Sequence, residues 1–167
     1  DLCLPRVSVQ DNPAFVLGSI LSASFHSGRN KLTLVSSPEL SAFPIWVEQL
    51  IAESTGKEGR GILPVIEQKI YPAQYYGSDR LLVYLALGKD PTTSRKLQEL
   101  SKQGIPTLEI RIPDLDQLGS LFFLWEFATA LTGAGIGINP FDQPNVESAK
   151  IQARNMIDTY RETGQLP

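Results

Sequence analysis

LLVYLAL, residues 81–87, is an unbroken run of leucine, valine, tyrosine and alanine near the middle of the chain. Side chains of a strand alternate between the two faces of its sheet. Because every position in this run is apolar, it predicts a strand that is covered on both faces, as in the interior of a parallel sheet. We therefore expect the fold to be built around residues 81–87.

Shorter apolar segments on both sides of this run alternate with helical segments. Further strands are predicted over residues 31–37 and 107–112, the latter nearer a sheet edge because its apolar residues alternate with polar ones. Residues 61–66 are predicted to form a short strand or an extended segment. Helices are predicted over residues 13–27, 41–54, 92–103, 117–132 and 145–163, after an irregular lead-in at residues 1–12. Alternating strands and helices predict a single α/β domain over residues 1–167 with a mostly parallel sheet.

Composition and charge narrow the classes of function. Of 167 residues, 42% are hydrophobic, which is enough for a buried core. A net charge of −3 gives no broad basic surface, so neither nucleic acid nor an anionic membrane is an expected partner. The single cysteine and single histidine cannot build a thiolate or multi-histidine metal site, and no metal is expected. Both counts suit a reducing, cytoplasmic setting.

Two features bear on the context of the chain. We find no apolar run of the roughly 18 residues that a bilayer span needs, so no membrane segment is expected. The chain begins with Asp1 and not with methionine, and we expect it to be a piece of a longer protein.

A glutamate near the end of the predicted helix 41–54 is the first candidate for chemistry. Glu53 follows Trp46 by seven residues, which places the two within about 20° of each other around the helix. We therefore expect Glu53 on the core side, where partial burial and the negative helix end favour its neutral form. A carboxyl group poised in this way can act as a general base. The structural alternative is that Glu53 pairs with Lys57 or a backbone N–H at the rim.

A second candidate group lies in FDQPNVESAK, residues 141–150. Gln143 and Lys150 are seven residues apart, so they lie on one side of the last predicted helix, near the border of its apolar stripe. An amide and an ammonium group placed in this way can face one ligand. The alternative is a solvated lysine and a glutamine at a helix entry.

Other candidates are weaker. ESTGKEG, residues 53–59, lacks the first glycine of a phosphate loop and has Glu58 after its lysine, so we reject that assignment. Glu126 lies in an apolar helix and is a reserve candidate for a base, although a structural hydrogen bond explains it equally well. His26, at the end of the first predicted helix, is a further candidate for chemistry, but a histidine at a helix end commonly has a structural role.

Two stretches of this chain resemble the C-terminal part of glucose-6-phosphate isomerases, and they occur in the same order as in that family. The likeness is to the bacterial type, including the form fused behind transaldolase. The two stretches are GRNKLTLV…WVEQLIAESTGKEGRGILPV, within residues 28–65, and GINPFDQPNVESAK, residues 137–150; the likeness extends over about residues 12–157. The resemblance implies a three-layer α/β/α sugar-isomerase (SIS) domain with about five strands. It also implies interconversion of glucose 6-phosphate and fructose 6-phosphate through a cis-enediol, in glycolysis and gluconeogenesis, without a cofactor.

The resemblance also implies roles for individual residues. In the family's E-S-x-G-K motif, the glutamate moves a proton between C1 and C2 of the sugar. This glutamate matches Glu53, which is therefore the expected base. Its neighbours Ser54, Thr55 and Lys57 are expected to contact the substrate. The family's second motif supplies a glutamine near the sugar and a lysine for ring opening, which match Gln143 and Lys150.

The chain departs from the family pattern in three respects. Asn145 stands where the second motif usually has glycine. The family's ring-opening histidine, donated across a dimer, has no counterpart near residues 75–87. The family's phosphate-binding residues belong to a preceding SIS domain, so the expected partners are a sugar phosphate, that N-terminal SIS domain and a second copy in a homodimer. A sugar-phosphate-binding SIS module without catalysis, or a dimerisation domain, is the alternative.

Overall fold

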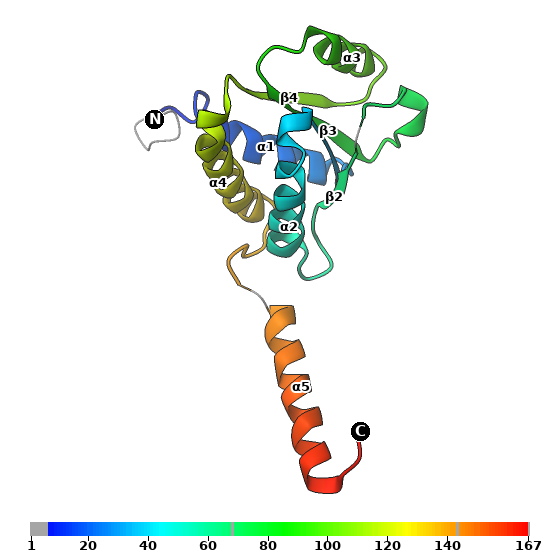
Figure 1. Ribbon diagram of the computed structural model, residues 1–167, viewed down its shortest axis with the longest axis vertical. Helices are drawn as coiled ribbons and strands as arrows, with labels where there is room; N and C mark the ends of the chain where they lie inside the picture. Colours follow the sequence, from blue (N-terminus) through cyan, green and yellow to red (C-terminus); the bar gives the residue numbers. More distant parts are fainter. Residues whose placement is uncertain (1–6, 68, 143, 167) are drawn as a thin grey trace.

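The computed structural model describes residues 7–67, 69–142 and 144–166 (Figure 1). The elements follow in the order α1 (Pro13–His26), β1 (Lys31–Ser36), α2 (Phe43–Thr55), β2 (Leu63–Ile66), β3 (Arg80–Leu87), α3 (Pro91–Lys102), β4 (Thr107–Ile112), α4 (Leu118–Ile136) and α5 (Pro144–Thr163), with three short 3-10 turns between them. All predicted strands and helices are present.

The sheet is parallel throughout, with the strand order β2-β1-β3-β4. β3 lies between β1 and β4, and its six interior residues are all buried, which confirms the prediction from residues 81–87. β4 is at an edge, as its alternating pattern indicated. The described residues form four strands and not the expected five or so.

Helices cover both faces of the sheet, so the three-layer α/β/α architecture is confirmed (Figure 1). One core joins the sheet to α1, α2 and α4, with Trp125 of α4 fully buried in it. The other core joins the opposite face to α3 through residues such as Leu97 and Leu100.

α1 begins where the sequence predicts. The side chain of Asn12 accepts hydrogen bonds from the backbone N–H groups of Ala14, at 3.0 Å, and Phe15, at 3.4 Å. It thereby satisfies donors that the first turn leaves unpaired, and Pro13 occupies the first helical position.

α4 is longer than predicted, because residues 133–136 continue the helix and do not form a loop. Gly133 packs against Pro140, and Gly135 packs against Ser22 of α1, so the small residues allow close approach. The helix ends at Gly137, whose φ of 76° is in the left-handed region.

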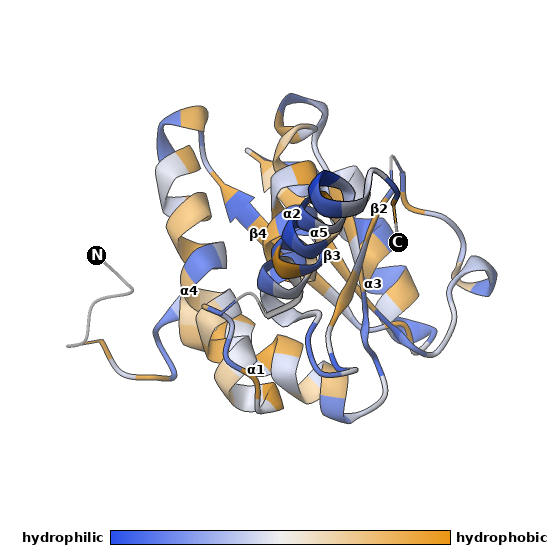
Figure 2. Cartoon of the chain, turned by 90° about the horizontal axis from the view of Figure 1, so that it is seen from below, coloured by the Kyte–Doolittle hydropathy of each residue, from blue (hydrophilic) through white to orange (hydrophobic). Residues whose placement is uncertain are grey.

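The expectation that no apolar segment is long enough to span a bilayer is wrong for α4. The stretch Leu115–Ile136 is long and apolar enough to cross a membrane by length and composition. In this structure α4 packs against α1 and α2, and Figure 2 shows the largely apolar character of α1 and α4.

α5 extends away from the rest of the molecule (Figure 1). Of its side chains described in the structure, all are exposed except Thr159, which is half-buried. Its apolar residues Ile151, Met156, Ile157 and Tyr160 are therefore in contact with solvent.

Candidate functional site

A hollow of about 340 Å³ lies beside the C-terminal half of α2. It is lined by Trp46, Gln49, Leu50, Glu53, Ser54 and Pro140. Glu53 and Trp46 line it together, so their predicted placement on one side of the helix is consistent with the structure. Gln49, one turn before Glu53, donates a hydrogen bond of 3.2 Å to the Glu53 carboxylate.

The expectation that Glu53 is partly buried on the core side is wrong. Its side chain is exposed, and it does not pair with Lys57 either. The core side of α2 is centred on Val47, which is fully buried, and Glu53 lies about 120° away from Val47 around the helix. Trp46, half-buried, marks the border of the core and not its centre. The carboxylate is therefore open to a ligand in the hollow.

Ser54 shares the hollow with Glu53, whereas Thr55 is turned into the protein. Thr55 is fully buried. Its hydroxyl donates to the carbonyl of Ile51 at 2.8 Å and accepts from the N–H of Ile62 at 3.0 Å. These bonds connect the end of α2 to the segment before β2, so the expected contact of Thr55 with substrate is not available in this structure.

Lys57 is also buried, with 5% of its surface exposed. Its ammonium group donates to the carbonyl of Asn139 at 2.8 Å, to the carboxylate of Asp142 at 2.9 Å and to the backbone carbonyl of Asp142. These three acceptors match the three donors of an ammonium group. Lys57 therefore joins the two motifs of the sequence to each other, and its expected contact with substrate finds no free donor.

The turn after Lys57 strengthens this junction. Glu58 and Gly59 both have positive φ, 54° and 72°, and the backbone groups of Lys57 and Arg60 pair across them. Arg60 then donates to the carbonyl of Ile136 at 3.0 Å. Arg60 thus bonds to the last residue of α4, and Lys57 bonds to the segment that follows it. Pro140 of this segment lies at the wall of the hollow.

The other described candidates are not among the residues that line the hollow. Lys150 is exposed on α5 and is not among the residues that line the hollow. Gln143 lies outside the described residues. Glu126 is exposed on α4, and the His26 ring is 2.9 Å from the carbonyl of Gly135, a contact that joins α1 to α4. In the described part of the chain, no three His, Cys, Asp or Glu side chains are grouped to hold a metal ion.

Parallel sheets commonly bind ligands beyond the carboxyl ends of the strands, where the strand order reverses. That point lies between β1 and β3, and side chains of the protein bond to one another there. The Ser37 hydroxyl is 3.1 Å from that of Tyr84, which donates to the Asp90 carboxylate at 2.8 Å. Hydrogen bonds from the side chain and backbone of Thr93, and then from Tyr84, lower the pKa of Asp90 to about 2, and burial raises the pKa of Tyr84.

Sequence reasoning missed four residues that line the hollow: Gln49, Leu50, Pro140, and Trp46, which was expected only in the core. The first had a signal that could have found it, since Trp46, Gln49 and Glu53 follow the spacing of one helix face. The position of Pro140 depends on the Lys57 contacts and has no signal in the local sequence.

Comparison with known proteins places these features in context. No family model matches the chain. A glucose-6-phosphate isomerase of Leptospira biflexa is 29% identical over 86% of this chain and 40% of its own length. One from Bacillus thuringiensis is 28% identical over 85% of this chain and 40% of its own length. The chain thus spans about two fifths of the curated relatives that it matches.

Solved structures agree on the fold. A hypothetical protein from Thermus thermophilus superposes with a TM-score of 0.71 at 18% identity, over 91% of this chain and 46% of its own. A glucose-6-phosphate isomerase from Chlamydia trachomatis gives a TM-score of 0.61 at 17% identity, over 92% of this chain and 40% of its own. In sequence and in fold, this chain is therefore similar to one part of glucose-6-phosphate isomerases.

Proposed function

We propose that this chain is the part of an aldose–ketose isomerase that carries its catalytic base, Glu53, and that the enzyme interconverts glucose 6-phosphate and fructose 6-phosphate. The observation that supports it most directly is the exposed Glu53 carboxylate in a hollow large enough for part of a sugar. The relatives named glucose-6-phosphate isomerase supply the substrate and the reaction.

In the proposed reaction Glu53 removes a proton from C2 of the open-chain aldose. The electron pair of that C–H bond forms the C1=C2 double bond of a cis-enediol, and the carbonyl oxygen at C1 takes up a proton. The double-bond electron pair then takes the proton back from Glu53 at C1, and the C2 hydroxyl releases its proton as the C2=O carbonyl forms, which balances the proton taken up at the C1 oxygen and gives the ketose. A carboxylate within hydrogen-bond reach of both carbons can serve both steps.

The other residues of the two motifs have separate proposed roles. Ser54 contacts the sugar beside Glu53, while Thr55 and Lys57 position the hollow through their internal bonds. By the family resemblance, Gln143 and Lys150 act on the sugar and in ring opening. None of the described residues that line the hollow is cationic. In this proposal the phosphate is held by a preceding SIS domain of the same cytoplasmic protein, as the family resemblance implies.

A second candidate function is sugar-phosphate binding without catalysis. It is favoured by the described lining of the hollow, where no histidine, lysine or arginine is present to open the sugar ring. Saturable binding of fructose 6-phosphate without turnover distinguishes this function from isomerisation.

Replacement of Glu53 by glutamine tests the proposal. Glu53→Gln keeps the size of the side chain and its bond to Gln49 but removes the base, so conversion of fructose 6-phosphate to glucose 6-phosphate should fall by roughly 100-fold or more. Glu48→Gln is the matched control, because Glu48 is exposed on the same helix and does not line the hollow.

The assay uses the chain alone and the longer polypeptide that contains it. Equal turnover in Glu53→Gln and the unchanged protein contradicts the role of Glu53. Binding without turnover in the longer polypeptide supports the second candidate function.

A further inference from the structure

An aromatic side chain forms one wall of the hollow beside Glu53. Trp46 begins a row of α2 side chains spaced four residues apart, in which Leu50 and Ser54 follow. Gln49 and Glu53 form the neighbouring row, also four residues apart. The hollow thus has an apolar side at Trp46 and Leu50 and a polar side at Gln49 and Glu53.

The indole ring of Trp46 is held in place by two other aromatic rings. Its centroid lies 5.4 Å from that of Phe43 and 4.5 Å from that of Phe122 of α4, the second in an edge-to-face arrangement at 74°. Trp46 is half-buried, so part of its surface packs on the core and part faces the hollow. A ring fixed in this way loses little conformational freedom when a ligand packs against it.

A sugar fits this lining because it has two kinds of surface. Its hydroxyl groups form hydrogen bonds with amide, carboxylate and hydroxyl side chains, whereas its carbon-bound hydrogens present an apolar surface. These hydrogens carry partial positive charge, and the face of an aromatic ring is negative. Packing of the carbon chain against an indole ring therefore adds an electrostatic attraction to the burial of apolar surface.

Helix geometry decides which part of the sugar reaches Trp46. Glu53 follows Trp46 by seven residues, or two turns, which is about 10 Å along the helix axis. A sugar whose C1–C2 bond lies at the Glu53 carboxylate therefore reaches Trp46 only with the opposite end of its carbon chain. That end does not change its bonding in the proposed reaction.

We propose that Trp46 is a substrate-binding residue, against which the carbon chain of the sugar phosphate packs beyond C3. The inference rests on the proposed function for the identity of the ligand, and it assigns a contact to a residue outside the E-S-x-G-K motif. Because the contact is the same before and during proton transfer, it lowers the KM and leaves kcat unchanged.

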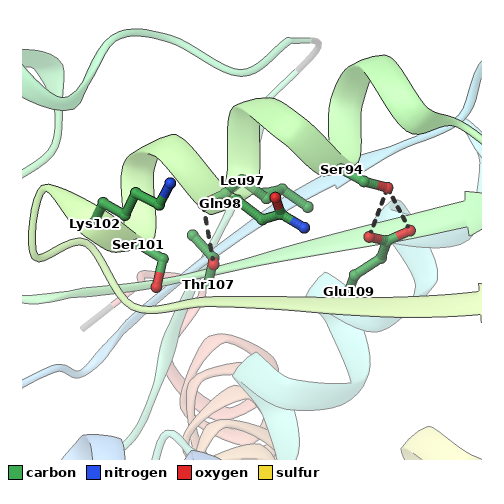
Figure 3. A pocket seen from close by; sticks show the side chains of 7 residues that line it. All are labelled: Ser94, Leu97, Gln98, Ser101, Lys102, Thr107 and Glu109. Atoms are coloured by element: carbon green, nitrogen blue, oxygen red, sulfur yellow. Dashed lines mark hydrogen bonds between the residues drawn. The ribbon is translucent and has the colours of Figure 1, made fainter.

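A second hollow of the described chain serves as a reference. It lies between α3 and β4 and measures about 390 Å³, and Figure 3 shows its lining side chains. There the Ser94 hydroxyl donates to the Glu109 carboxylate at 2.9 Å, and the Thr107 hydroxyl donates to the carbonyl of Leu97 at 3.4 Å. Polar groups of this hollow thus bond to the protein itself, and no aromatic ring is among the described residues that line it. A substitution in this second hollow therefore provides a control.

Kinetics of the longer polypeptide that contains this chain provide the first test. Trp46→Leu removes the ring, so the KM for fructose 6-phosphate should rise by roughly three- to tenfold while kcat stays within about twofold. Trp46→Phe keeps part of the ring and should raise the KM less. Gln98→Leu, in the hollow of Figure 3, is the matched control and should leave the KM unchanged. Circular dichroism confirms that each variant is folded.

Fluorescence provides the second test and does not require turnover. This chain has two tryptophans, and Trp125 is fully buried, so acrylamide quenches the emission of Trp46. Subtraction of the emission of Trp46→Phe isolates this signal from every other tryptophan of the polypeptide. Fructose 6-phosphate should reduce the quenching of Trp46 in a saturable manner, in the unchanged protein and in Glu53→Gln alike.

The outcomes of the two tests distinguish this inference from the proposed function. Turnover without protection of Trp46, or a Trp46→Leu variant with an unchanged KM, overturns the inference alone. Protection of Trp46 together with unchanged turnover in Glu53→Gln supports the inference and contradicts the role of Glu53. Absence of both protection and turnover in the folded protein contradicts both.

Discussion

At the scale of single residues, burial divides the stretch ESTGK, residues 53–57, into residues that can contact a ligand and residues that stabilise the fold. Glu53 and Ser54 face the hollow, whereas Thr55 and Lys57 form their hydrogen bonds with the protein itself. The spacing of Glu53 from Trp46 could be predicted from helix geometry. The burial of Lys57 could not, because its partners Asn139 and Asp142 are more than 80 residues away.

Lys57→Met tests the structural role of this lysine. The substitution leaves the carbonyl of Asn139 without its donor and removes the ion pair with Asp142, so the free energy of unfolding should fall by about 1–3 kcal/mol. Urea denaturation measures it. Lys89→Met, at an exposed position, is the control and should change stability by less than about 0.5 kcal/mol. Equal effects of the two substitutions contradict the role given to Lys57.

At the scale of elements, the contact of α1 with α4 depends on small residues. A Cβ at Gly18 would lie 2.7 Å from the Cβ of Leu131 and 2.9 Å from the carbonyl oxygen of Ala128. Gly135 packs against Ser22 of α1 in the same way, and Gly133 packs against Pro140, so α4 extends through both glycines although the local sequence suggests a turn. Glycines end a helix in isolation but allow two helices to pack closely in a folded protein.

Two glycine substitutions test this packing. Gly18→Ala should lower the free energy of unfolding by about 1–3 kcal/mol, since α1 and α4 would be forced apart. Gly119→Ala, in α4 with nothing near its added methyl group, should leave stability unchanged or raise it by up to about 1 kcal/mol. Thermal unfolding of the two variants distinguishes them, and destabilisation by both would contradict the explanation.

The start of α3 gives a pH-dependent prediction. The folded-state pKa of Asp90, about 2, lies below the ordinary value of 3.8. Asp90 therefore contributes stability that is fully present above pH 3.8 and is lost as the pH falls toward 2.

Asp90→Asn keeps a helix-capping side chain but cannot ionise. The difference in unfolding free energy between this variant and the unchanged chain should shrink between pH 5 and pH 2. Asp90→Ala also removes the cap and should cost about a further 1 kcal/mol at neutral pH. Urea denaturation at both pH values measures these differences, and a pH-independent difference for Asp90→Asn would contradict the prediction.

At the scale of the whole molecule, α5 stands out because its described side chains, apart from Thr159, are exposed to solvent. It carries Lys150, and its apolar side chains are exposed. An isolated helix of this length is marginally stable in water, because most helical stability comes from packing.

Limited trypsin digestion tests the state of α5. Cleavage after Lys150 and Arg154 should precede cleavage after Lys96 and Lys102, which are exposed on α3 but belong to a helix packed on the sheet. Mass spectrometry of the early fragments gives the order. Cleavage in α3 before α5 would show that α5 is protected in solution.

The sequence alone determined the order of strands and helices, the central place of residues 81–87 and the start of α1 at Asn12. These features depend on periodicity and capping within one element, which a few consecutive residues specify. Only the tertiary structure decided that Glu53 is exposed, that Lys57 is buried, that α4 runs through its glycines and that β4 has an open edge. Each of these depends on contacts between segments distant in the chain, and the apolar pattern of a single segment does not specify its neighbours.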